Sequence, residues 1–303
     1  MEKTERINSM SDMKKQIKIY LIFVLGVCWI VGIAAIFTQG NSRNILYQIL
    51  QKGFTALPVI AAFFTRCITK DKAGLRISLK VWKNPKLWGF CAFAPSILIV
   101  VGALIYFMLF PEQYSGVFNI GSVIGTGQVI QVNNPFQFSL VCVMIAALCV
   151  PIQLLELGEE IGWREYLLPK QIELYGMKKA ILLNGFYWGL AHLPLIYLGF
   201  NYSLDNVGAP WSNMAMMMLV CMTMGIICSY VMVRSNNVIF SAIIHGVVNV
   251  IGEIPVFISV SHKSGLLGPN PTGIIGMSGL IVCAAIMFVR VGKWRNKLNE
   301  DRQ

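Results

Sequence analysis

Glu156-Leu157-Gly158-Glu159-Glu160-Ile161-Gly162-Trp163-Arg164-Glu165 is a polar stretch at the end of a long apolar segment. It places four carboxylates within ten residues of hydrocarbon-like sequence, whereas most other acidic residues lie outside the apolar segments. Ionisable side chains inside a membrane segment are costly and usually mark a function. The stretch is therefore the predicted working site, and the rest of the chain is considered for what it brings to it.

The composition around this stretch is that of a membrane protein. Hydrophobic residues make up 56% of the 303 residues and charged residues only 13%, whereas a soluble domain carries roughly 25% charged residues. The mean hydropathy is +0.64. A helix that crosses the ~30 Å hydrocarbon core needs about 20 apolar residues, and lipid admits only helices or closed barrels. Eight segments meet this length, which predicts an all-α polytopic membrane helix bundle: 19–38, 47–68, 88–110, 134–160, 180–200, 211–233, 237–258 and 271–290.

The basic residues predict the orientation of the bundle. With the N-terminus in the cytoplasm, all of the 25 Lys and Arg residues except Arg43, Lys52 and Lys263 fall on the cytoplasmic side. This asymmetry follows the positive-inside rule and predicts N-in and C-in with about eight spans. The net charge of +11 is therefore topogenic, and no nucleic-acid partner is implied.

The domain organisation follows from the same segments. We expect a cytoplasmic tail over 1–18, one transmembrane domain over 19–291 with its catalytic core near 134–258, and a second cytoplasmic tail over 292–303. The first apolar run exceeds the about 7–15 residues of a signal-peptide core, so it should remain as an anchor. We expect a multi-pass integral membrane protein of the plasma membrane. The eight cysteines contain no CxxC pair and are interpreted as packing residues.

Polar residues of three predicted spans are expected to meet. At 1.5 Å per residue, Glu159 lies about 15 Å from the cytoplasmic end of its helix, His192 about 18 Å, His245 about 12 Å and Asn249 about 18 Å. The three spans therefore place these side chains at similar depth, in the cytoplasmic half of the bilayer. The agreement predicts one shared polar site.

Within the acidic stretch, the helical spacing separates two roles. Glu156, Glu160 and Arg164 share a face at i, i+4 and i+8, and Glu160 to Arg164 is a well-oriented ion pair. Glu159 is offset by about 100° and can face a cavity as a general base. The alternative for Glu160 and Arg164 is a helix-end salt bridge without chemistry.

On the other two spans, His245 and Asn249 lie at i, i+4 and can both donate to one oxyanion. The alternative is a hydrogen bond between helices, and a lone His192 is often only a packing residue. Glu253 extends the His245 face by one more turn toward the other side of the membrane. Its role, like those of Glu156 and Glu165, is left unassigned.

Three ordered motifs resemble those of the CAAX-protease and bacteriocin-processing (Abi, CPBP) family of intramembrane endopeptidases, including the Ras-converting type of CAAX prenyl endopeptidase. They are Glu159-Glu160-x-x-Trp163-Arg164, Trp188-x-x-x-His192 and His245-x-x-x-Asn249. The resemblance implies eight helices, a water-activating Glu159 assisted by His192, an oxyanion site at His245 and Asn249, and supporting roles for Glu160 and Arg164. This sequence departs from the family pattern at Trp163 and Trp188, where Phe is common, and at Glu165, where Gly is usual.

The predicted function is an intramembrane endopeptidase that hydrolyses a peptide bond near the cytoplasmic face. Its partner would be a peptide or protein substrate, lipidated or membrane-inserted, within the bilayer. Two alternatives remain: a transporter with a buried Glu/His relay, and a non-catalytic immunity or scaffold membrane protein. No cofactor is expected; the alternative is zinc held by Glu159, His192 and His245, a donor set that suits a catalytic zinc site.

Overall fold

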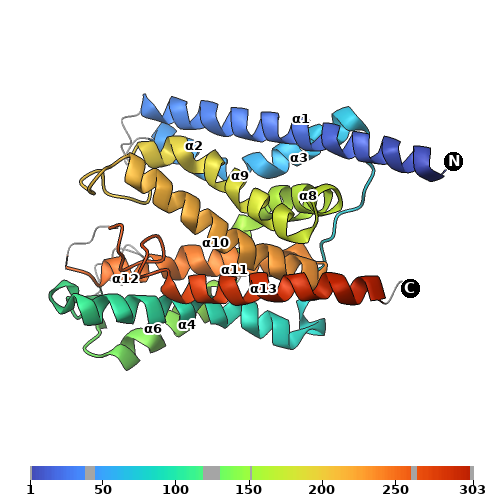
Figure 1. Ribbon diagram of the computed structural model, residues 1–303. Coiled ribbons are helices and arrows are strands. Elements are labelled where there is room, and N and C mark those ends of the chain that lie inside the picture. The colour runs from blue at the N-terminus through green and yellow to red at the C-terminus, as the bar shows by residue number, and fades with distance from the viewer. Residues whose placement is uncertain (1, 38–44, 119–129, 151, 261–264, 301–303) are drawn as a thin grey trace.

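The computed structural model describes residues 2–37, 45–118, 130–150, 152–260 and 265–300. It is a helix bundle whose two termini lie at the same end (Figure 1). The helical elements are, in chain order, α1 (Glu2–Ile36), α2 (Ile45–Phe54), α3 (Leu57–Thr69), η1 (Val81–Lys83), α4 (Pro85–Leu109), η2 (Pro111–Gln113), α6 (Pro135–Cys149), η3 (Ile152–Glu156), α7 (Leu157–Glu160), η4 (Ile161–Leu167), α8 (Leu168–Tyr175), α9 (Met177–Tyr197), α10 (Trp211–Ser235), α11 (Val238–Gly252), α12 (Ile254–Phe257) and α13 (Ser278–Glu300).

Strands are almost absent from the described residues, which confirms the predicted all-α membrane bundle. β1 (Val117–Phe118) and β2 (Ile130–Gln131) form a short antiparallel pair. Within the described part of the chain, five helices are long and apolar enough to cross a membrane, and α6 with the helical residues Leu154–Tyr175 makes a sixth candidate, bent by 58°. The eight-span count and the sidedness stay predictions.

Several boundaries differ from those expected from the sequence. α1 runs without a break from Glu2, because no Gly or Pro interrupts its first turns, so residues 2–18 are helical and continuous with the first predicted span. The expected second span is two helices, α2 and α3. α13 begins at Ser278 rather than near 271, and continues to Glu300, past the expected boundary at 291.

Asparagine side chains define where three helices begin. The side-chain oxygens of Asn84, Asn134 and Asn237 each accept a hydrogen bond from a backbone N–H in the first turn, of α4, α6 and α11 respectively. α4 and α6 also begin with proline, whose missing N–H costs nothing at that position. The Asn237 cap sets the residue at which α11 begins, and thereby the position along the bundle of the residues on α11.

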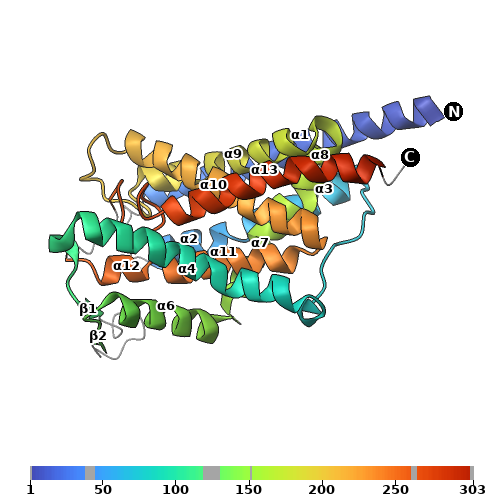
Figure 2. The ribbon, with the colours of Figure 1, turned by 60° about the horizontal axis from the view of Figure 1, so that its bottom comes forward.

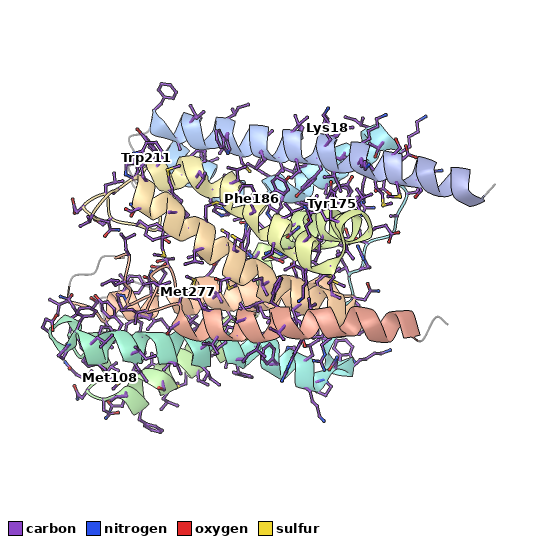
Figure 3. The ribbon with its side chains drawn as sticks, in the orientation of Figure 1. Lys18, Met108, Tyr175, Phe186, Trp211 and Met277 are labelled. Carbon is purple, nitrogen blue, oxygen red and sulfur yellow. The ribbon has the colours of Figure 1, made fainter. Side chains whose placement is uncertain are left out.

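The bundle has two ends that are named here for later use. The termini end holds the beginning of α1, the turns 175–177 and 235–238, and the end of α13; the loop end holds 198–210 and 265–277 (Figures 1 and 2). Figure 3 places Trp211 and Met108 near the loop end, and Lys18 and Tyr175 toward the termini end.

An extended segment crosses the termini end, and we call residues 70–80 the strap. It leaves α3 and crosses to the start of α11 (Figure 1), where the Val238 N–H donates to the Arg76 carbonyl at 3.0 Å. The Asn237 side chain accepts from the Ser78 N–H at 3.0 Å and donates to the Ser78 carbonyl at 2.8 Å. The strap therefore ties α3 to α11.

Asp71 attaches the beginning of the strap to α8. Its carboxylate accepts from the Ala73 N–H at 3.0 Å and pairs with the Lys170 ammonium at 3.0 Å. Partial burial acts to raise the pKa of Asp71, but the Ala73 hydrogen bond and the Lys170 charge outweigh it and hold that pKa below its ordinary value.

Close backbone contacts position the acidic stretch and the helix beside it. A Cβ added to Gly162 of η4 would lie 2.4 Å from the Pro58 Cβ of α3, so only glycine allows this approach. A Cβ added to Gly225 of α10 would lie 2.8 Å from the Gly185 Cα of α9. α7 and η4 consequently lie between α3 and α11 in the interior (Figure 2).

Candidate active site

The acidic stretch is helical, but its helix changes geometry at each end. Glu159 and Glu160 lie in α7, a single α-helical turn between the 3₁₀ turn η3 and the π-helical segment η4. π-Helical turns are rare and occur frequently at functional sites. Within the α-helical turn α7, the two adjacent carboxylates have different partners.

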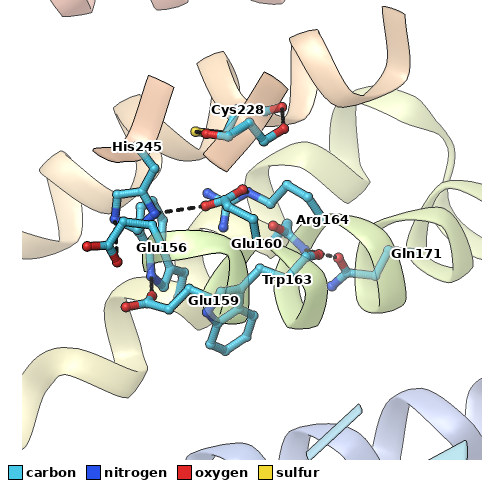
Figure 4. Close-up of polar contacts among 11 residues, drawn as sticks. Glu156, Glu159, Glu160, Trp163, Arg164, Gln171, Cys228 and His245 are labelled. Atoms are coloured by element: carbon cyan, nitrogen blue, oxygen red, sulfur yellow. Dashed lines mark hydrogen bonds and ion pairs between the residues drawn. The ribbon is translucent and has the colours of Figure 1, made fainter. Parts of the chain in front are cut away.

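The Glu160 carboxylate contacts two buried side chains, the imidazole of His245 and the guanidinium of Arg164 (Figure 4). His245 Nδ1 lies 3.0 Å from Glu160 Oε1, and Arg164 Nε lies 3.4 Å from Glu160 Oε2. The side chains of Glu160 and Arg164 are both 0% exposed. The predicted ion pair is thus present, and it also orients the His245 ring through Nδ1.

Glu159 has a separate environment. Its Oε2 accepts a hydrogen bond of 2.6 Å from the Trp188 indole N–H (Figure 4). The carboxylate also lines a cavity. As the helical spacing predicted, Glu160 pairs with Arg164 while Glu159 lines the cavity. The Trp188 N–H keeps the Glu159 carboxylate in one orientation.

Trp188 belongs to the second motif, but its role beside Glu159 was not predicted from the sequence. Besides its bond to Glu159, its ring lies under the Arg164 guanidinium at 4.2 Å and packs edge-on against His245 at 5.0 Å between centroids. A Phe at this position would retain the ring contacts but could not donate to a carboxylate. The signal was available, because a Trp four residues before His192 puts an N–H on the same helix face as the histidine.

His192 has one ring nitrogen committed and one available. Its Nδ1 lies 2.9 Å from the Trp188 carbonyl oxygen, which can only accept, so Nδ1 carries the proton and Nε2 keeps a lone pair. The ring also packs against Phe54 at 5.3 Å and lines the same cavity as Glu159. Nε2 can therefore act as an acceptor for water.

All four predicted catalytic side chains reach one cavity of about 550 Å³. Glu159 comes from α7, His192 from α9, and His245 and Asn249 from α11. Asn249 is exposed to solvent, whereas Glu159, His192 and His245 are buried at its inner wall. Their meeting in space is observed; their catalytic roles stay predictions.

Glu156 joins this group, although the sequence assigned it no role. Its Oε2 lies 4.0 Å from His245 Nε2. Donor atoms of Glu156, Glu159 and His245 all lie within 4.8 Å of one another, which makes these residues the metal-ligand group found among the described residues. The zinc set expected from the sequence had His192 in the place of Glu156. Zinc–nitrogen and zinc–oxygen bonds of about 2.0–2.2 Å would require these donors to move closer together.

The remaining two unassigned carboxylates lie in different places. Glu165 is 1% exposed and pairs with Arg66 at 3.1 Å and with Arg76 at 3.6 Å, so it anchors the strap. A glycine, which is usual at this position in the family pattern, could not form these ion pairs. Glu253 is exposed and lines the cavity on the side of the loop end.

The fold and the site together define a polytopic membrane protein with carboxylate, imidazole and carboxamide groups around an internal cavity. Residues 136–251 match a family model described as Type II CAAX prenyl endopeptidase, Rce1-like. The chain is also 29% identical over 132 residues to "CAAX prenyl protease 2" of Methanococcus maripaludis, a match that covers 43% of this chain and 45% of that protein.

The matched region contains Glu159, Glu160, Arg164, His192, His245 and Asn249. Over this region the chain is similar to the CAAX protease (CPBP) family, and the predicted resemblance is confirmed. The names of the matched family and relative indicate a CAAX endopeptidase-like protease. The match spans less than half of the relative's length.

Proposed function

We propose that the chain is an intramembrane endopeptidase that hydrolyses a peptide bond with a water molecule activated by Glu159. The observation that carries the proposal is the convergence of Glu159, His192, His245 and Asn249 from three helices on one cavity. A transporter or a scaffold has no need of such a set, and the family match favours neither.

The first step is the activation of water. The Glu159 carboxylate, oriented by the Trp188 N–H, accepts a proton from a water molecule in the cavity. His192 accepts the second hydrogen of that water at Nε2 and thereby directs the oxygen toward the substrate carbonyl. The resulting hydroxide forms a bond to the carbonyl carbon, and a tetrahedral oxyanion develops.

His245 and Asn249 are placed to stabilise that oxyanion. They share one face of α11 one turn apart, and the Asn249 carboxamide is accessible from the cavity. A His245 ring protonated on both nitrogens donates one N–H to Glu160 and directs the other toward the carboxylate-lined cavity. Donors fixed in advance in a site of low dielectric lower the barrier most effectively. Collapse of the intermediate breaks the C–N bond, and Glu159 gives its proton to the leaving amine.

The proposal does not require a metal. The second candidate is a zinc-assisted hydrolase, which the Glu156, Glu159 and His245 group favours. Bound zinc would polarise the water and the carbonyl. Metal analysis of the purified protein, with activity measured before and after chelation, distinguishes the two.

The substrate is proposed to be a peptide or protein segment in the membrane, lipidated in the manner that the relatives' names suggest, and the location a plasma membrane. The test is Glu159→Gln, which keeps the size and one hydrogen-bond acceptor. Peptides that accumulate in membranes carrying this variant, and disappear when the native chain is restored, are the substrates. A Glu159→Gln protein that folds normally and changes no membrane peptide would refute a protease.

A further inference from the structure

A second cavity lies where α13 packs against α4 and α10, and we call it the α4–α13 groove. Its volume is about 620 Å³, and among the described residues it shares no lining residue with the active-site cavity. Ile97, Val282 and Ile286 of its wall are 55%, 59% and 48% exposed. The groove is therefore open along the outer surface of the bundle, which faces lipid in a membrane. Figure 1 shows α13, in red, beside α4.

Basic side chains gather at one end of the groove. Lys86 lies in the first turn of α4, Arg234 in the last turn of α10, and Arg290 on the part of α13 nearer its C-terminus. All three are exposed, and the described residues that line the groove include no Asp or Glu. Three like charges gathered at one place repel one another, and an anion between them offsets that repulsion. This end of the groove therefore suits an anionic group.

The rest of the groove is largely apolar. Beyond Lys86, α4 contributes Phe90, Ala94 and Ile97, which recur at the i, i+4 and i+7 spacing of one helix face. α13 follows the same order, with Arg290 at the charged end and apolar residues toward its start. At 1.5 Å per residue, the α4 face from Lys86 to Ile97 is about 16 Å long. One leaflet contributes about half of the ~30 Å hydrocarbon core, so the apolar wall matches the depth of one leaflet.

The residues before α4 place the charged end at the membrane surface. Trp82 of η1, just before α4, is 67% exposed, and tryptophan is enriched at the membrane–water interface. Lys86 follows it in the first turn of α4 and so lies near the level of the lipid headgroups. The positive-inside rule predicts that this end is cytoplasmic, and the cytoplasmic leaflet is the one that carries anionic lipids.

From these observations we propose that the α4–α13 groove binds an anionic phospholipid. Its phosphate contacts Lys86, Arg234 and Arg290, and one acyl chain lies along the apolar faces of α4 and α13. A neutral lipid would not compensate the three charges, and a free phosphate would not cover the apolar wall. No active-site residue takes part, so the proposal does not depend on the proposed function and can be tested by binding alone.

The experiment maps lipid contacts in a membrane. The full-length protein is reconstituted in phosphatidylcholine vesicles that contain a small fraction of a phosphatidylglycerol probe with a photoreactive diazirine in its acyl chain. A phosphatidylcholine probe with the same chain is the reference. After illumination, labelled peptides are identified by mass spectrometry, and the labelling of the α4 and α13 residues in the groove is compared between the two probes.

We expect the phosphatidylglycerol probe to label the groove about 10-fold more than the phosphatidylcholine probe, because each basic side chain at an anionic headgroup contributes roughly a 5-fold factor. The triple variant Lys86→Gln, Arg234→Gln and Arg290→Gln should bring this ratio close to one. Ala94→Phe fills the apolar wall without a change of charge, so it should reduce the labelling of the groove by both probes.

A second triple variant, Lys14→Gln, Lys15→Gln and Lys18→Gln, is the matched control. It removes the same charge from exposed residues of α1 that do not line the groove. The preference for phosphatidylglycerol should remain in this variant. The thermal unfolding midpoint of every variant is measured to show that the protein is folded.

Equal labelling by the two probes would mean that the groove holds ordinary surrounding lipid, and this result overturns the proposal. The proposal is also overturned if the control variant loses the preference as fully as the groove variant, or if Ala94→Phe leaves the labelling unchanged. Competition by glycerol phosphate would assign the charged end to a free phosphate compound. Stronger displacement of the probe by a neutral prenylated peptide than by phosphatidylglycerol would assign the groove to a substrate tail. Either of these last two results excludes the phospholipid as the occupant.

Discussion

Replacing Trp188 by Phe tests the contribution of the indole N–H apart from that of the aromatic ring. In the structure that N–H donates to Glu159 at 2.6 Å, while the ring face lies under Arg164 at 4.2 Å. Phe keeps a ring face for the guanidinium and removes only the donor. A hydrogen bond to a charged group contributes about 1.5–3 kcal/mol. If that energy holds Glu159 in its reactive orientation, the rate falls about 10- to 150-fold, at 1.36 kcal/mol for each factor of ten.

The assay is cleavage of an internally quenched peptide, taken from the accumulated membrane peptides, by protein reconstituted in lipid vesicles. We expect kcat/KM to fall by this factor while the thermal unfolding midpoint changes little. In a Glu159→Gln background, Trp188→Phe should cause a much smaller loss, because both changes remove the same interaction.

Trp163→Phe is the matched control. Trp163 is also fully buried, but its indole nitrogen has no hydrogen-bond partner among the described residues. This variant should affect stability rather than catalysis. An unchanged kcat/KM in Trp188→Phe, or an equal loss in Trp163→Phe, would show that the indole N–H does not orient the base.

Three further predictions concern the surroundings of the site. Glu160→Gln leaves Arg164 as an uncompensated buried charge and should destabilise the protein by about 3–5 kcal/mol, well beyond the loss in Glu159→Gln; equal unfolding midpoints of the two variants would contradict this. The strap should loosen in acid, because folding lowers the pKa of Asp71. The stabilisation that ionised Asp71 gives the folded state is therefore fully present above its pKa in the unfolded chain, and it is lost as the pH falls through its pKa in the folded chain. Protease cleavage of the strap should rise in that window in the native chain, and Asp71→Asn should cleave at the same elevated rate at all pH values. Chelation should leave peptidase activity unchanged, and an activity that is lost with chelator and restored by zinc would favour the metal-assisted alternative.

The arrangement of the helices could largely be predicted from the sequence. Long apolar runs predict helices because lipid offers the backbone no other partner, and each of the eight predicted segments overlaps a helix among the described residues. The joins between helices were less predictable. The break between α2 and α3 and the late start of α13 were not predicted, although Pro58 lies at the start of α3 and the Gly- and Pro-rich residues 265–276 precede α13.

The site was predicted in its membership but not in its bonds. Helical spacing alone indicated that Glu160 faces Arg164, that Glu159 faces elsewhere, and that His245 and Asn249 share a face. It could not indicate that Trp188 donates to Glu159, nor that Glu156 rather than His192 approaches His245 Nε2. Those contacts join residues more than 25 positions apart, and the rotation of each helix about its axis decides them.

The amino-acid sequence by itself determined that this chain is a helical membrane protein and which few polar side chains its apolar segments carry, because hydrophobicity and spacing act locally along the chain. Only the tertiary structure decided which groups these side chains contact. The Trp188 N–H of α9 donates to Glu159 of α7, and Glu156 of η3 approaches His245 of α11. That outcome depends on how distant segments pack, which no local property of the sequence contains.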